Sequence, residues 1–283
     1  MRAAVLGGGG VAGIAWASGL LAGMAREGVH VAQADVFVGT SAGSVVGAQL
    51  ACGAAPEALL AEHLTPRHAS LETARPYSQA DAEARNRALM DKVAGDLAAA
   101  RRRIGAFALR SGTVPPAERR AIVAARLPQT HWPDSALRVV AVDAASGEHR
   151  VFDRHSGVEL VDAVAASCAV PGAWPVVAIQ GRQYMDGGIR SLTNADIALG
   201  ASRVLVIAPL GWGDGNPVSG HLRAEVARLR EAGARVNVIV PDPASAEALG
   251  DNVLDPARRA PSARAGLAQG LRAAAGVAAD WAT

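Results

Sequence analysis

Apolar and polar residues follow one another along the chain in blocks that predict strands and helices in alternation. Short runs rich in β-branched residues recur, each bounded by glycine, aspartate or proline. They are "AAVLG" (3–7), "DVFVG" (35–39), "LRVVAVD" (137–143), "HRVFD" (149–153), "VVAI" (176–179), "RVLVIAP" (203–209) and "RVNVIVPD" (235–242). Several of these runs are apolar throughout, which is typical of strands covered on both faces.

Helical spacing of apolar residues fills the segments between these runs. We expect helices near 11–27, 42–53, 56–63, 79–103, 116–126, 158–167, 194–200, 219–232 and 243–249, with a closing helix in the tail from about 255. Strands alternating with helices predict an α/β fold, a three-layer α/β/α sandwich with a mainly parallel central sheet. A length of 283 residues fits a single domain, 1–283. Gln180-Gly181, between two short runs, predicts a hairpin as the exception.

Residues 64–116 interrupt this alternation, because the segment is polar, rich in arginine and flanked by proline. We expect a helical insertion over the sheet, forming a wall of a pocket or a lid. Within it, "AARRRIGAFALR" (99–110) sets basic side chains beside Ile104, Phe107 and Leu109. That composition suits peripheral contact with a membrane or a lipid aggregate, and it suits a solvated helix face equally well.

Composition and charge exclude some classes of protein. Half of the residues are apolar but only 4% are aromatic, so we expect a core of Ala, Val, Leu and Ile. The net charge of +2 and the lack of a recognition motif argue against a nucleic-acid partner. Cys52 and Cys168 stand in apolar contexts without metal-ligand spacing, so we expect small buried side chains, no metal and no cofactor.

The first apolar stretch, residues 3–25, carries no charge and resembles a membrane span or signal peptide at first sight. Seven of its residues are glycine, four of them adjacent, which suits a buried strand, a tight turn and a buried helix better. We therefore expect a cytoplasmic protein.

The glycine turn Gly8-Gly9-Gly10-Val11-Ala12-Gly13 fits G-x-G-x-x-G, which lays a dinucleotide on a helix N-terminus. That fold also needs an acidic residue at the end of the second strand, and here Asp35 precedes the strand instead. A nucleotide-binding module remains an alternative.

A second motif, Gly39-Thr40-Ser41-Ala42-Gly43, fits G-x-S-x-G, the sharp strand-to-helix turn that exposes a nucleophilic serine. Its simpler interpretation is that Ser41 only caps a helix. Two parallel strands that both end in glycine turns bring those turns to one edge of a sheet. The first turn then offers amides to the oxyanion of an acyl-transfer intermediate, Gly9 and Gly10 foremost, with the amide of Ala42.

A nucleophilic serine needs a base, and Ser41, Asp186 and His221 occur in the order of the α/β-hydrolase triad. In that fold several strands precede the nucleophile, whereas here one does. His221 also begins a charged amphipathic helix, where a surface or capping role is simpler.

The third motif is "YMDGGIRSLTNADIALGA" (184–201), in which Asp186, Gly187 and Gly188 close a strand. The ordered motifs, together with "AASCAVPGAWPVV" (165–177), resemble the patatin-like acyl hydrolases over most of residues 2–209. The resemblance implies a Ser–Asp dyad: Ser41 as nucleophile, Asp186 as base, and the turn from Gly8 to Gly13 as oxyanion hole. It departs at Ala12, where that family usually carries Arg or Lys, which favours a simple esterase over a phospholipase.

The sequence thus predicts a serine lipid acyl hydrolase that cleaves carboxylic esters through an acyl-enzyme, with lipids or small esters as substrates. A silent member of the same fold that binds a lipid or a partner protein is the other alternative.

Overall fold

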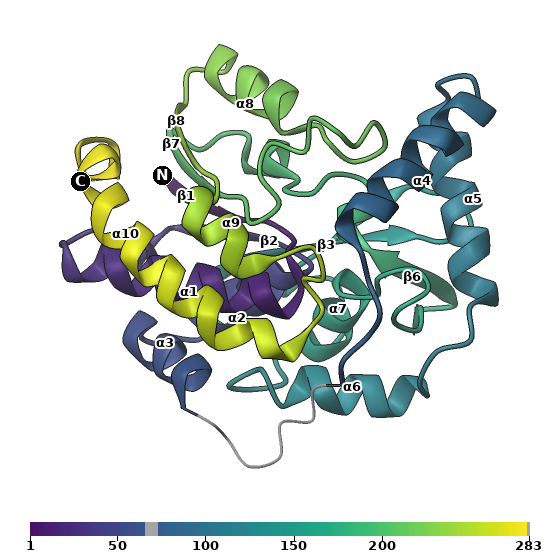
Figure 1. The fold of residues 1–283 in the computed structure, drawn as a ribbon, viewed down its shortest axis with the longest axis horizontal. Coiled ribbons are helices and arrows are strands. Elements are labelled where there is room, and N and C mark those ends of the chain that lie inside the picture. The colour runs from purple at the N-terminus through teal and green to yellow at the C-terminus, as the bar shows by residue number, and fades with distance from the viewer. Residues whose placement is uncertain (66–72, 282–283) are drawn as a thin grey trace.

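A computed structural model describes residues 1–65 and 73–281, and it confirms the predicted α/β architecture (Figure 1). Within these residues one eight-stranded sheet has the order β5-β6-β3-β2-β1-β7-β8, with β4 paired to β3. The strands are β1 (Arg2–Leu6), β2 (Val36–Thr40), β3 (Ala136–Asp143), β4 (His149–Phe152), β5 (Val177–Ile179), β6 (Arg182–Asp186), β7 (Arg203–Ile207) and β8 (Arg235–Ile239). Each apolar run of the sequence is a strand.

The sheet is parallel through its centre and antiparallel at one end. Strands β3, β2, β1, β7 and β8 pair in parallel, whereas β4 and β6 run antiparallel to β3. The predicted hairpin at Gln180-Gly181 joins β5 to β6, and both residues have positive φ. Because β1 and β2 are parallel neighbours with Leu6 opposite Gly39, the two glycine turns leave the sheet at the same edge.

Helices cover both faces of the sheet. They are α1 (Gly10–Arg26), α2 (Ala42–Ala51), α3 (Pro56–Leu64), α4 (Gln79–Lys92), α5 (Leu97–Arg110), α6 (Pro116–Ala124), α7 (Leu160–Ser167), α8 (Leu222–Glu231), α9 (Pro243–Leu249) and α10 (Arg259–Trp281). Ala4 and Leu6 of β1 face a core shared with α1, α2, α7 and α10, and the alternate residues Ala3 and Val5 face one shared with α8. Successive side chains of β1 therefore point to opposite faces of the sheet, and each face packs against its own layer of helices.

Two predicted helices differ from the structure. The segment 79–103 contains a break, because Ala94 and Gly95 adopt positive φ and the Asp96 side chain caps α5 by accepting from the amide of Ala99. The predicted helix 194–200 is a 3₁₀ turn, Ala195–Ala198, that follows Asn194 in the left-handed region. Ala94 and Gly95 interrupt the first of these helices although the apolar spacing continues, whereas Asn194 precedes the second, which is only a short 3₁₀ turn.

The C-terminal helix α10 lies directly on α1 (Figure 1). A Cβ added to Gly19 of α1 would lie 2.1 Å from the carbonyl oxygen of Ala263, and one added to Gly266 of α10 would lie 2.1 Å from that of Trp16. Glycine on both helices thus lets the backbones touch. This contact buries the apolar helix α1, whose N-terminus forms the first glycine turn.

The predicted insertion contains α4 and α5, while its residues 66–72 lie outside the described part of the chain. Helix α4 buries no residue, and α5 buries only Ala100, Gly105 and Ala108. In the described residues, no helix combines the length and apolar character needed to cross a bilayer.

Candidate active site

Ser41 lies at the sharp turn between β2 and α2. Its backbone has φ 52° and ψ −120°, a strained conformation for a residue with a side chain. The turn depends on glycine at both ends, because a Cβ on Gly43 would lie 1.9 Å from the carbonyl oxygen of Leu6, and one on Gly39 would lie 2.5 Å from the Cα of Ser44. The Ser41 side chain makes no capping hydrogen bond to α2, so the interpretation of Ser41 as only a helix cap is wrong.

The hydroxyl of Ser41 donates instead to Asp186, 145 residues later in the chain. The distance from Ser41 Oγ to Asp186 Oδ2 is 2.7 Å, and the amide of Gly188 donates to Asp186 Oδ1 at 2.7 Å. Ser41 is 7% exposed and Asp186 is 4% exposed. Strand β6 ends at Asp186, which pairs with Ala141 of β3, so the sheet itself fixes the carboxylate at this edge.

Burial changes the acidity of Asp186. Desolvation of the carboxylate raises its pKa from 3.8 to about 7, although the bond from Ser41, the amide of Gly188 and the charge of Arg119 each lower it. A carboxylate with a pKa near 7 is a far stronger base than a free aspartate and is still substantially ionised at neutral pH. The dry site therefore supplies the basicity that an aspartate general base needs.

His221, the histidine of the possible triad, bonds elsewhere. Nε2 of His221 lies 2.9 Å from the carbonyl oxygen of Val218, at the start of α8. No histidine of residues 1–65 and 73–281 lines the cavity at Ser41. The geometry favours the Ser41–Asp186 pair over a triad.

The glycine turn offers two of its three predicted oxyanion donors. The amide of Gly8 donates to the carbonyl of Leu192 at 2.8 Å, so the prediction that Gly8 is a donor is wrong in this conformation. A Cβ on Gly8 would lie 3.5 Å from Ser41 Cβ, so Gly8 instead lets the turn approach the nucleophile. Within the described residues no acceptor bonds to the amides of Gly9, Gly10 or Ala42.

The rest of the turn is held by the surrounding backbone. The amide of Gly13 donates to the carbonyl of Gly9 at 2.7 Å, and that of Ala12 donates to Val253 at 3.1 Å. Gly10 adopts φ 59°, and a Cβ there would lie 2.4 Å from the carbonyl oxygen of Val253. The free amides are thus fixed before any substrate arrives, which is what stabilisation of an oxyanion requires.

Ser167 and Asn194 hold the turns at Ser41 and Asp186 together. Ser167 Oγ accepts from the amide of Ser41 at 2.9 Å, which ties α7 to the nucleophile turn. Asn194 Nδ2 donates to Thr40 Oγ1 at 3.0 Å and to the carbonyls of Ser191 and Gly187. These bonds explain why the "AASC" and "TNAD" segments accompany the motifs in the sequence.

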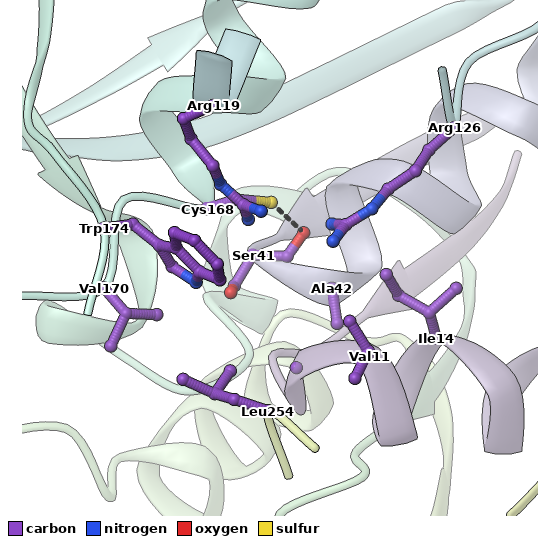
Figure 2. A pocket seen from close by; sticks show the side chains of 11 residues that line it. Val11, Ile14, Ser41, Ala42, Arg119, Arg126, Cys168, Val170, Trp174 and Leu254 are labelled. Carbon is purple, nitrogen blue, oxygen red and sulfur yellow. Dashed lines mark hydrogen bonds between the residues drawn. The ribbon is translucent and has the colours of Figure 1, made fainter. Parts of the chain in front are cut away.

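Ser41 opens into a small cavity (Figure 2). Its volume is about 20 Å³, room for roughly one water molecule. The lining residues are Gly10, Val11, Ile14, Ser41, Ala42, Arg119, Arg126, Cys168, Val170, Trp174 and Leu254. An acyl chain needs more space than this, so side chains of the wall must move when a substrate binds.

Two arginines of the wall were not predicted. In Figure 2 the guanidinium groups of Arg119 and Arg126 point toward Ser41. Arg119 is 4% exposed, and its guanidinium carbon lies 3.8 Å from the centre of the Trp174 ring. Arg119 lies in α6, where it shares a buried helix face with Ile122 and Val123, and this spacing was its signal in the sequence. Arg126 follows α6, which ends at Ala124, and no local pattern singled it out. The positive charges beside Ser41 therefore come from α6 and the residues after it, while position 12 of the glycine turn is the buried Ala12.

Cys168 also lines the cavity, which the sequence did not indicate. Its thiol donates to the carbonyl of Ser41 at 3.2 Å, and burial raises its pKa. Cys168 is therefore a neutral thiol that supports the turn. Cys52, predicted to be buried, is only partly so. In the described residues no three His, Cys, Asp or Glu side chains gather as metal ligands would.

Comparisons with known proteins bear on this arrangement. A family model described as patatin-like phospholipase matches residues 4–199. Among solved structures, VipD from Legionella pneumophila is similar at 12% sequence identity, with a TM-score of 0.45, over 97% of this chain and 67% of that one. No curated protein matched the sequence. Because the family model spans well over half of the chain and includes both glycine turns and Asp186, the chain belongs to the patatin-like phospholipase family.

Proposed function

We propose that the protein is a serine lipid acyl hydrolase that cleaves carboxylic esters through an acyl-enzyme on Ser41, with Asp186 as general base. Family membership supports lipid acyl hydrolysis in general. The observation that carries the specific mechanism is the 2.7 Å hydrogen bond from Ser41 Oγ to a buried carboxylate of raised pKa. Ser41 lies at the N-terminus of α2, and Gly10 at the N-terminus of α1 lines the same cavity. Helix N-termini favour negative charge.

Acylation begins when Asp186 accepts the hydroxyl proton as Ser41 Oγ attacks the ester carbonyl. The carbonyl oxygen becomes negative in the tetrahedral intermediate, and the amides of Gly9, Gly10 and Ala42 are the donors available to it. The proton on Asp186 then passes to the departing alkoxide, which leaves as an alcohol.

Deacylation repeats these steps with water. Asp186 removes a proton from the water molecule, which attacks the acyl carbon. The proton on Asp186 then passes to Ser41 Oγ as the acyl–oxygen bond breaks, which releases the fatty acid and restores the free serine. The apolar side chains of Val11, Ile14 and Leu254 line the cavity and suit an acyl chain. Arg119 and Arg126 supply positive charge at the same place, so a substrate with an anionic group near the ester is compatible with the site despite Ala12.

Two alternatives are less well supported. A nucleotide-binding module does not account for the hydrogen bond from Ser41 to the buried Asp186. It also needs an acid after the second strand, and Asp35 lies before β2, where it accepts from the amide of Arg2. A catalytically silent lipid-binding member would not need a serine bonded to a buried carboxylate, or free amides beside that serine.

Hydrolysis of p-nitrophenyl esters and of phospholipid in mixed micelles tests the proposal. We expect Ser41→Ala to lower kcat/KM by about 10⁴-fold or more. Ser262→Ala is the matched control, because Ser262 is also buried but donates to the carbonyl of Ala248, away from the candidate site. If wild type hydrolyses neither class of ester, or if Ser41→Ala is as active as wild type, the proposal is wrong.

A further inference from the structure

Helix α5 presents Phe107 and Leu109 to solvent, while Ile104 packs against the core beside small buried residues. Phe107 is 53% exposed and Leu109 is 46% exposed, while Ala100, Gly105 and Ala108 are buried. Among the described residues, the only other large apolar side chains this exposed are Met1 and Leu271. A helix that merely covers a sheet edge would be expected to bury its large apolar residues.

The same surface carries a cluster of positive charge. Arg102, Arg103 and Arg110 are exposed, and the helix contains no acidic residue. Arg101, by contrast, turns inward and donates to the carbonyl of Arg190. We call the exposed residues Arg102, Arg103, Phe107, Leu109 and Arg110 the outer face of α5.

Helix α5 is fixed rigidly beside the candidate active site. A Cβ on Gly105 would lie 1.8 Å from the carbonyl oxygen of Ala144, and Ala108 packs with Met185, the neighbour of Asp186. The Phe107 ring lies against Gly172, where a Cβ would meet it at 2.9 Å. Gly172 belongs to the loop whose Val170 and Trp174 line the cavity. The outer face thus stands next to a loop that lines the cavity at Ser41.

We propose that the outer face of α5 docks the protein on an anionic lipid surface. Exposed aromatic and aliphatic side chains among arginines match the boundary between lipid headgroups and acyl chains. Each arginine near an anionic leaflet strengthens binding by about fivefold, and salt screens this contribution. This proposal rests on the proposed function, because docking would bring lipid esters to the wall around Arg119 and Trp174.

Vesicle sedimentation tests the docking without turnover when every protein carries Ser41→Ala. We expect binding to vesicles containing about one quarter phosphatidylglycerol, and at least tenfold weaker binding to pure phosphatidylcholine. The double change Phe107→Ser and Leu109→Ser should weaken binding to the anionic vesicles at least about tenfold. The triple change Arg102→Gln, Arg103→Gln and Arg110→Gln should remove most of the preference for phosphatidylglycerol and its salt dependence.

Leu271→Ser is the matched control, since Leu271 is 39% exposed on α10. It should bind the anionic vesicles as the parent does, and unfolding temperatures of all variants show that the fold is kept. Equal binding to both vesicle types, no binding to either, or equal losses for Leu271→Ser and the double variant would each overturn the proposal. Because Ser41→Ala is used throughout, failed docking is distinct from failed hydrolysis, which the wild-type ester assay reports separately.

Discussion

The carboxyl edge of the sheet, with its two glycine turns and Asp186, is buried, whereas helices α4 to α6 beside it are largely exposed. At the edge the chemistry comes from backbone geometry: close contacts at Gly39 and Gly43, free amides at Gly9 and Gly10, and a carboxylate at a strand end. Helices α4 to α6 contribute side chains, with Arg119 on the wall and the outer face of α5 toward solvent.

The buried edge and the surrounding helices differ in how well they tolerate substitution. The edge has almost no freedom to change, because an added Cβ at its turns would meet backbone atoms. The exposed positions of the helices around it can change residues without disturbing the sheet, whereas an inward position such as Gly105 cannot. We therefore expect substitutions at the edge to abolish activity or folding, and substitutions in α4 to α6 to tune the site.

Among the changes that compare the two regions, removal of the proposed base should have the largest effect. Asp186→Asn should lower kcat/KM by about 10³-fold or more, because an amide cannot accept the hydroxyl proton. Asp143→Asn is the matched control: Asp143 is also buried at a strand end, where it accepts from the amides of Ala145 and Ser146 and from Arg182. Ester hydrolysis measures both variants. Comparable losses would show that the loss in Asp186→Asn is not specific to Asp186.

A glycine from each region gives the next largest effect. Gly43→Ala should lower the free energy of unfolding by about 3 kcal/mol or more, because the new methyl group would meet the backbone of Leu6. Gly112→Ala, just after α5, has no atom within 4 Å of the added Cβ and should stay within about 0.5 kcal/mol of wild type. Urea unfolding measures both, and equal stability of the two variants would contradict the tight packing of the edge.

The raised pKa of Asp186 also predicts a loss of stability of about 3 kcal/mol between pH 5 and pH 8. Between pH 4 and about 7 the unfolded chain loses this proton while the folded protein keeps it, so the stability of wild type falls as pH rises through this window. Asp186→Asn stays neutral and retains bonding partners in Ser41 and Gly188. Its advantage over wild type should therefore be larger at pH 8 than at pH 5 in urea unfolding. An advantage that is the same at both pH values would mean that the pKa is not raised.

The smallest effect concerns Arg119. Ester hydrolysis should rise with pH around a midpoint near 7, because Asp186 must be ionised to act as base. The charge of Arg119 lowers this pKa, so Arg119→Gln should move the midpoint upward and reduce kcat/KM at pH 7 by less than about tenfold. Arg85→Gln, an exposed arginine of α4, should leave the midpoint in place. An unmoved midpoint in Arg119→Gln would show that the wall does not influence the base.

The same contrast explains what could be predicted from sequence. Gly39 and Gly43 mark a sharp turn because only glycine allows their backbone contacts, and apolar runs reveal the strands that bring Ser41 and Asp186 to one edge. For these glycines and strands, the local sequence preference and the tertiary contacts require the same residues.

Predictions failed where the outcome depended on contacts across the fold. The engagement of the Gly8 amide depends on where Leu192 lies, and no local pattern encodes that position. Arg119 and Arg126 resemble ordinary surface arginines until α6 is placed over Ser41. The break between α4 and α5 at Gly95 was missed because the apolar spacing continues through it.

Labelling with a fluorophosphonate, followed by intact-mass measurement, tests the central claim most directly. We expect one covalent adduct on wild type, none on Ser41→Ala, and an adduct that forms at least about 100-fold more slowly on Asp186→Asn. Labelling of Ser41→Ala at the wild-type rate would show that the nucleophile is another residue. Labelling of Asp186→Asn at the wild-type rate would show that the buried carboxylate is not the base.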